Sequence, residues 1–252
     1  MASADDVANG ASLTPARRNQ LVISCEHGGR EVPPAYAPLF SGREALLDSH
    51  RGWDAGALDL ARHMADALRV PLHAATTTRL LVDLNRSIGH RQLFSEVMRS
   101  LPRARRQDLV DCHYRPHRQA VEAEVARMVA SGRRVIHVAS HSFTPMLDDV
   151  PRHADVAWLY DPRRPGEVAF ARSWMRELAR LAPDLRLRRN YPYRGRGDGL
   201  TAALRKRHPD AAYVGIELEV NQSFVEQHGP WDRLKAALVD SLKRALAGAT
   251  GR

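Results

Sequence analysis

Two histidines in this 252-residue sequence stand at the ends of short apolar runs that are typical of buried strands. His27 follows residues 21–25 and precedes a Gly-Gly turn, and His141 closes a run that begins at residue 135. In open α/β sheets, the carboxyl ends of the strands face a crevice in which ligands bind. Both imidazoles are therefore candidates for a functional site. For His27, a loop histidine that solvates a turn is the competing interpretation.

Three carboxylates add to this pattern. Glu217 and Glu219 interrupt an apolar run at residues 212–222 and lie two positions apart, so they share one face of the predicted strand. A buried carboxylate is strongly unfavourable unless it is paired or binds a metal ion. Asp54 stands at the amino end of a predicted helix, where capping of free N–H groups is an alternative explanation for an aspartate.

His27, Asp54 and His141 form a donor set of two imidazoles and one carboxylate, which leaves a fourth position open. That set is typical of a single catalytic zinc ion rather than a structural one. Such an ion polarises a carbonyl and lowers the pKa of a water molecule, while a nearby carboxylate moves the proton. We assign the proton transfer to Glu219. Glu217 is the alternative, because a period of two does not separate the two side chains.

Polar residues in loops near the predicted strand ends are candidates for substrate contacts. Arginine can hold a carboxylate through two parallel hydrogen bonds, which a lysine cannot do. An internal Asp83–Arg86 pair that holds its own loop is the competing interpretation. The candidates are Arg79, Asn85, Arg86, Ser140, Arg194 and Arg196.

Other patterns argue against different chemistries. The sequence contains no Gly-x-Ser-x-Gly elbow and no glycines in dinucleotide-binding or P-loop spacing. His113 and His117 lie four residues apart, but Pro116 between them breaks the helix that a metal pair would need. His137 precedes His141 by four residues on the same predicted strand and is expected to be a core histidine.

The elements that must position these residues alternate between strands and helices along the whole chain. This alternation predicts α/β architecture, with a single three-layer domain built on a mixed, mostly parallel sheet with helices on both faces. We expect the domain to span residues 20–252, after a flexible leader at residues 1–19. Pro116 should kink or restart the helix that begins near residue 105.

Charge and composition limit the class of partner. The net charge of +9 and the pI of about 10.2 raise the alternative of a basic nucleic-acid-binding module. The arginines are scattered and accompany no nucleic-acid-binding motif, so this alternative is disfavoured. The absence of an apolar run of about 18 residues excludes a membrane span. Cys25 and Cys112 make no disulfide framework, which fits a cytoplasmic location. The oligomeric state stays open.

Six short motifs, in this order, resemble the N-formylglutamate amidohydrolase family. They are SCEHGG at 24–29, the helix start at Asp54, DLNR at 83–86, HYRPHR at 113–118, SHSF at 140–143 and GIELEVNQ at 215–222. The resemblance covers nearly all of the chain after the leader. It implies a zinc-peptidase-like (phosphorylase/hydrolase-like) fold and zinc-dependent hydrolysis of a small acidic N-acyl amino acid. The implied reaction converts N-formyl-L-glutamate into formate and glutamate in histidine degradation.

A more distant likeness links the sequence to zinc-dependent N-acetylmuramoyl-L-alanine amidases. In those amidases a histidine follows the first strand and a carboxylate opens the next helix, which correspond here to His27 and Asp54. A later strand-end histidine and a glutamate on the last strand correspond to His141 and Glu219. This likeness keeps two alternative substrates open, namely another acyl amino acid and a cell-wall peptide.

Overall fold

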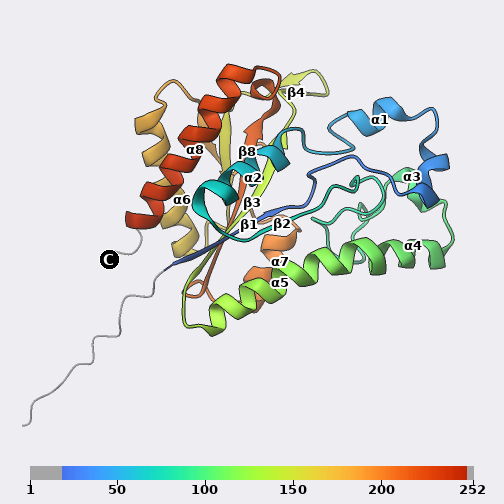
Figure 1. Ribbon diagram of the computed structural model, residues 1–252, viewed down its shortest axis with the longest axis horizontal. Coiled ribbons are helices and arrows are strands. Elements are labelled where there is room, and N and C mark those ends of the chain that lie inside the picture. The colour runs from blue at the N-terminus through green and yellow to red at the C-terminus, as the bar shows by residue number, and fades with distance from the viewer. Residues whose placement is uncertain (1–18, 249–252) are drawn as a thin grey trace, which may run out of the picture.

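The structure of the protein, a computed structural model, describes residues 19–248, so the predicted leader at residues 1–19 lies outside the described residues except for Asn19. Its centre is a six-stranded sheet (Figure 1). In spatial order the strands are β2 (Leu72–Ala74), β1 (Gln20–Cys25), β3 (Val135–Phe143), β8 (Tyr213–Asn221), β6 (Val156–Leu159) and β7 (Leu187–Arg189). All neighbours are parallel except β8 and β6, which confirms the mixed, mostly parallel sheet.

Helices cover both faces of the sheet, as the three-layer prediction requires. On one face lie α2 (Ala57–Leu68), α6 (Pro165–Leu181) and α8 (His228–Gly248), and on the other lie α5 (Arg115–Ala130) and α7 (Leu200–Arg207) (Figure 1). Each helix buries apolar residues at helical spacing, such as Phe170, Trp174 and Leu178 on α6. Burial of these stripes on both sides encloses the central strands, so β3 and β8 are apolar along most of their length.

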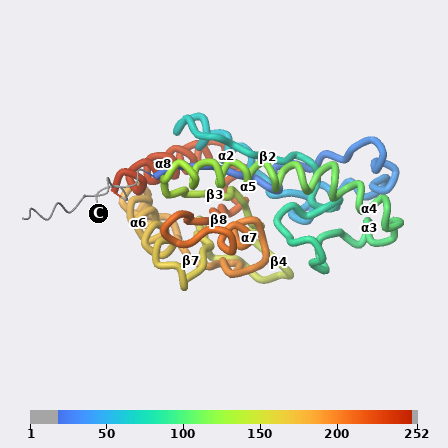
Figure 2. Tube along the Cα trace, turned by 90° about the horizontal axis from the view of Figure 1, so that it is seen from below, coloured from blue at the N-terminus to red at the C-terminus, as the bar shows by residue number. Residues whose placement is uncertain are grey.

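A separate lobe extends beyond the sheet (Figures 1 and 2). It consists of a 3-10 helix at Pro34–Phe40, α1 (Glu44–Asp48), α3 (Glu96–Arg99) and α4 (Arg103–Leu109). A hydrophobic cluster of its own holds it together, and this cluster includes Phe40, Leu81 and Met98. Residues 80–82 are buried in this cluster and belong to no strand.

The remaining elements are short. A π-helix at Val110–Tyr114 joins α4 to α5, whose first turn contains Pro116. The backbone stays helical through this junction, so the change before Pro116 is a switch to π-helical hydrogen bonding rather than a restart of the helix. A two-stranded hairpin, β4 (Met146–Leu147) with β5 (Val150–Pro151), follows β3, and a 3-10 helix at Gln222–Phe224 follows β8. Among the described residues, no helix has the length and apolarity needed to cross a membrane.

His137 is a core histidine, as its place on β3 predicts. Its ring is fully buried, with Nε2 at 2.8 Å from the Ser24 hydroxyl and Nδ1 at 2.7 Å from the Tyr213 hydroxyl. Burial lowers its pKa from the ordinary 6.5 to about 4. The imidazole is therefore neutral in the folded protein at neutral pH, and each ring nitrogen has a hydroxyl partner.

We expect this histidine to weaken the fold as the pH falls. Between pH 6.5 and about 4 the unfolded chain binds a proton that the folded chain does not, so stability rises with pH in this window and is lost on acidification. At about 1.4 kcal/mol per pH unit, the loss between pH 7.5 and 4.5 is on the order of 2–3 kcal/mol. Urea unfolding at both pH values should show this extra loss in the wild type but not in His137→Gln. Equal losses in the two proteins would contradict the assignment.

Candidate functional site

Three parallel strands bring their carboxyl ends to one edge of the sheet and place the predicted chemical groups together there. His27 follows the end of β1, His141 lies near the end of β3, and Glu219 on β8 is the register partner of His141. These residues and Asp54 line one cavity of about 300 Å³. The sheet thus brings His27 and Glu219 into one cavity although they are 192 positions apart in the sequence, as the strand-end pattern predicts.

The loop that carries His27 can approach the neighbouring strand closely because of its two glycines. A Cβ atom on Gly28 would lie 2.9 Å from the carbonyl oxygen of Ala75, and one on Gly29 would lie 2.3 Å from that of Thr76. The Gly28 N–H also donates to the Ala75 carbonyl at 3.0 Å. The Gly-Gly pair therefore allows a backbone approach that fixes His27 over the strand ends.

Asp54 is held against the same loop, because its backbone N–H donates to the His27 carbonyl at 2.9 Å. Helix α2 begins three residues later, and its N-cap is Gly56, which has a φ of 78°. No side chain caps this helix end. The capping explanation for Asp54 is therefore wrong, and its buried carboxylate is directed at the two histidines instead.

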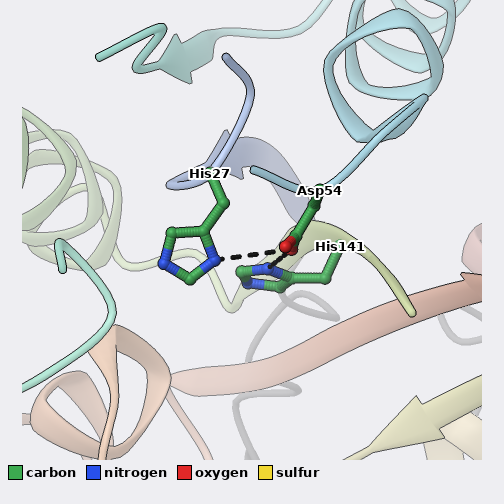
Figure 3. A group of neighbouring side chains, drawn as sticks. All are labelled: His27, Asp54 and His141. Carbon is green, nitrogen blue, oxygen red and sulfur yellow. Dashed lines mark hydrogen bonds and ion pairs between the residues drawn. The ribbon is translucent and has the colours of Figure 1, made fainter. Parts of the chain in front are cut away.

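His27, Asp54 and His141 form a buried group that could hold a metal ion (Figure 3). Oδ2 of Asp54 lies 2.8 Å from Nδ1 of His141 and 3.4 Å from Nδ1 of His27. One donor atom of each residue lies within 4.8 Å of the others, which suits bonds of about 2.0–2.2 Å to a common ion. Two imidazole nitrogens and a carboxylate oxygen are donors that fit zinc.

Two buried carboxylates hold the far sides of the histidine rings. Nε2 of His27 lies 2.7 Å from Oδ1 of Asp83, and Nε2 of His141 lies 3.1 Å from Oε2 of Glu26. Such outer carboxylates keep the proton on the distal ring nitrogen, so that the other nitrogen is free to bind a metal. Oε1 of Glu26 also faces Nε2 of His117 at 3.4 Å.

The roles of Glu26 and Asp83 were not predicted. The available signal was a charged residue directly after an apolar run, because Glu26 follows β1 and is completely buried. Asp83 carried a second signal in its proximity to Arg79, four residues earlier. In the structure Arg79 donates to Oδ2 of Asp83 at 2.7 Å and to Oδ1 of Asp54 at 3.4 Å. Its charge is therefore used to hold these carboxylates.

The electrostatics of the group follow from burial and from this pairing. Burial alone would raise the pKa of Asp54, but His27, His141 and Arg79 together hold it well below its ordinary value. Burial alone would lower the pKa of His141, but Asp54 and Glu26 raise it well above its ordinary value. Both directions follow from a histidine placed between two buried carboxylates.

The two glutamates of β8 have different surroundings. Glu219 is 4 % exposed, and its Oε2 has no hydrogen-bond partner among the described residues. Burial raises its pKa to about 8, and the charges of Asp54 and Glu217 act in the same direction. Glu217 is less buried, and its Oε1 accepts a 2.6 Å hydrogen bond from the Thr201 hydroxyl. Both line the cavity, but only Glu219 combines deep burial with an unpartnered oxygen.

Asn85, Arg86 and Arg194 also line the cavity. Oδ1 of Asn85 accepts a hydrogen bond from the backbone of Leu200, and Nη1 of Arg86 donates to the carbonyl of Asp198. Nε of Arg86 has no partner, and neither Arg86 nor Arg194 forms an ion pair within residues 19–248. The internal Asp83–Arg86 pair considered from the sequence is therefore not formed.

The other two predicted substrate contacts lie outside the cavity lining. The Ser140 hydroxyl is buried and donates to the Ala57 carbonyl at 2.9 Å, so it links β3 to helix α2. The Arg196 side chain lies 3.7 Å from the carboxylate of Asp161 and lines a separate basic hollow. Ser140 ends an apolar run and Arg196 lies in a loop, and in neither case does the sequence show which way the side chain points.

Several solved structures are similar to this chain. A gene product of Agrobacterium tumefaciens has a solved structure with a TM-score of 0.78 and 25 % identity, over 92 % of each chain. N-formylglutamate amidohydrolase from Ralstonia eutropha gives a TM-score of 0.66 and 19 % identity, over 93 % of this chain and 96 % of that one. An N-acetylmuramoyl-L-alanine amidase of Nostoc punctiforme gives a TM-score of 0.47 and 12 % identity, over 90 % of this chain and 97 % of that one.

No curated protein matches the sequence. The model of one family, N-formylglutamate amidohydrolase, matches residues 19–225, which include every residue that lines the cavity. This match favours a hydrolase over the basic nucleic-acid-binding module that the net charge suggested. The chain belongs to the N-formylglutamate amidohydrolase family.

Proposed function

We propose that this protein is a zinc-dependent amidohydrolase that converts N-formyl-L-glutamate into formate and glutamate. One observation carries the proposal: a single cavity joins a buried His-Asp-His group, an unpartnered glutamate and two arginines without carboxylate partners. The same proposal places the reaction in histidine degradation in the cytoplasm, in line with the family resemblance and the free thiols of Cys25 and Cys112.

In this proposal His27, Asp54 and His141 hold one zinc ion. The ion supplies Lewis acidity, which polarises the formyl carbonyl and makes a water molecule easier to deprotonate. Glu26 and Asp83 orient the two imidazoles through their Nε2 atoms. All five side chains are buried, so the site excludes bulk solvent and strengthens the electrostatic interactions within it.

Glu219 moves the proton. Its free Oε2 takes a proton from the attacking water as the oxygen–carbon bond forms, and it returns the proton to the amide nitrogen as the carbon–nitrogen bond breaks. Burial raises the pKa of Glu219 to about 8, so this carboxyl group holds a proton more readily than an exposed glutamate does. The formic acid that results passes its remaining proton to the new amine, so formate and glutamate leave, and no proton is gained or lost at Glu219 over the cycle.

Arg86 and Arg194 bind the substrate. N-formylglutamate carries two carboxylates. Within the described part of the chain, Arg86 and Arg194 are the two arginines of the cavity that form no ion pair, so each can bind one of them. A carboxylate held by two parallel hydrogen bonds from a guanidinium is oriented as well as attracted. Arg79, in contrast, already holds Asp54 and Asp83.

A substrate panel tests the proposal. The zinc-loaded protein is assayed with N-formyl, N-acetyl and peptide amides of Glu, Asp, Gln and neutral residues, with formate or amine release as the readout. N-formylglutamate should give the highest kcat/KM. Faster turnover of an N-acetyl amino acid or of a muramoyl peptide would show that this compound, and not N-formylglutamate, is the substrate.

The role of the arginines has its own test. Arg86→Gln should lower kcat/KM for N-formylglutamate by about a hundredfold, because the loss of one charged hydrogen-bonded contact costs about 2–3 kcal/mol. Arg103→Gln removes an exposed charge on the lobe and serves as the matched control, with kcat/KM unchanged. If neutral acyl amino acids were hydrolysed as well as acidic ones, the two arginines would not be a carboxylate-binding pair.

A further inference from the structure

A second hollow of about 400 Å³ adjoins the catalytic cavity. The two share four lining residues, and we refer to them together as the cleft. The shared residues are His50, Arg79, Arg86 and Tyr193. The second hollow is bounded by the lobe and by Leu147 of the β4–β5 hairpin. A single acyl amino acid bound at His27 and His141 would leave this hollow empty.

The charges in the second hollow are mostly paired. Arg51 lies 2.5 Å from a carboxylate oxygen of Glu96, and Arg79 is held by Asp83. Arg99, at the end of α3, contributes a hydrogen bond at 3.4 Å to a backbone carbonyl but forms no ion pair in the described part of the chain. Arg99 is therefore the one arginine lining this hollow alone that forms no ion pair within residues 19–248, and its charge helps to lower the pKa of Glu96.

The remaining walls alternate between apolar and polar groups. Leu80, Phe94 and Leu147 supply apolar surface, while Gln92 and Ser95 supply hydrogen-bonding side chains. Such a lining suits a short peptide, whose backbone needs polar partners and whose side-chain methylenes need apolar ones. A lining for a purely hydrophobic acyl chain would lack the arginine and the polar side chains.

We infer that the cleft accepts substrates longer than one acyl amino acid, namely N-acyl dipeptides with an acidic second residue. The scissile amide lies at the His-Asp-His group, and the terminal carboxylate reaches Arg99. Within residues 19–248, three guanidinium groups of the cleft lack a carboxylate partner, those of Arg86, Arg194 and Arg99, and N-formyl-glutamyl-glutamate carries three carboxylates. The inference rests on the proposed function, because it uses the same hydrolytic site.

The test compares four substrates on the zinc-loaded protein: N-formylglutamate, α-linked and γ-linked N-formyl-glutamyl-glutamate, and N-formyl-glutamyl-alaninamide, which has no terminal carboxylate. We expect one linkage of the acidic dipeptide to be hydrolysed at least as efficiently as N-formylglutamate. Arg99→Gln should lower the ratio of kcat/KM for this dipeptide to that for N-formylglutamate by about fivefold, the size expected of an exposed charge pair. Arg103→Gln should leave the ratio unchanged.

Two outcomes overturn the inference while the proposed function stands: hydrolysis of N-formylglutamate with rejection of both acidic dipeptides, and a dipeptide ratio that Arg99→Gln does not alter. If none of the substrates is hydrolysed, the proposed function fails, and calorimetric binding of N-acetyl-glutamyl-glutamate decides the inference by itself. Tighter binding than that of N-acetylglutamate, lost in Arg99→Gln, supports the extended cleft. Equal binding of the two ligands refutes it.

Discussion

Glu219→Gln is expected to keep zinc bound while kcat for N-formylglutamate falls by about two to four orders of magnitude. The glutamine amide has the size of the carboxylate but cannot accept and return a proton. Because Oε2 of Glu219 has no hydrogen-bond partner among the described residues, the substitution breaks no contact that the fold uses. Steady-state kinetics and metal analysis of the same preparation separate loss of proton transfer from loss of metal.

Glu217→Gln is the matched control on the same strand. Its amide oxygen can still accept the hydrogen bond from the Thr201 hydroxyl, so we expect a much smaller fall in kcat. The reverse ranking of the two variants would assign the proton transfer to Glu217. Loss of zinc in Glu219→Gln would instead make Glu219 part of the metal site.

The layered sheet and the strand-end histidines could be predicted because local patterns determine them. Apolar runs of strand length mark β1 and β3, and parallel strands have their carboxyl ends at one edge, so His27 and His141 were expected near each other. Apolar residues at helical spacing predicted α6 and α8, which pack against the sheet. The lobe was not predicted, because its buried residues come from short segments without a regular period.

Within the site, distant contacts decide what local patterns leave open. A period of two places Glu217 and Glu219 on one face. The hydroxyl of Thr201 on α7 and the deeper burial of Glu219 distinguish them. An aspartate before a helix suits a cap as well as a ligand, and the start of α2 three residues later decides the case for Asp54. A distant contact also decides the role of Ser140, whose hydroxyl donates a hydrogen bond to the carbonyl of Ala57 on α2, more than 80 positions away.

His141→Ala is expected to lose zinc, because it removes one of the three donors of the proposed site. The loss in zinc affinity should exceed the tenfold to hundredfold typical of an outer partner. Metal content after dialysis against a weak chelator measures the effect, and thermal unfolding verifies that the variant is folded. His137→Gln is the matched control, because it changes a buried histidine on the same strand that bonds only hydroxyl groups.

A substitution of Glu26, which lies behind His141, should weaken zinc binding less than the loss of His141 itself. Glu26→Gln leaves an oxygen beside Nε2 of His141 but removes the negative charge that makes the imidazole a stronger donor, so zinc affinity should fall about tenfold to a hundredfold. The expected order of zinc affinity is wild type, then Glu26→Gln, then His141→Ala. If His27→Ala and His141→Ala both kept stoichiometric zinc, the ligand assignment would be wrong. If only Glu26→Gln matched the wild type, the ligands would stand and Glu26 would serve the fold alone.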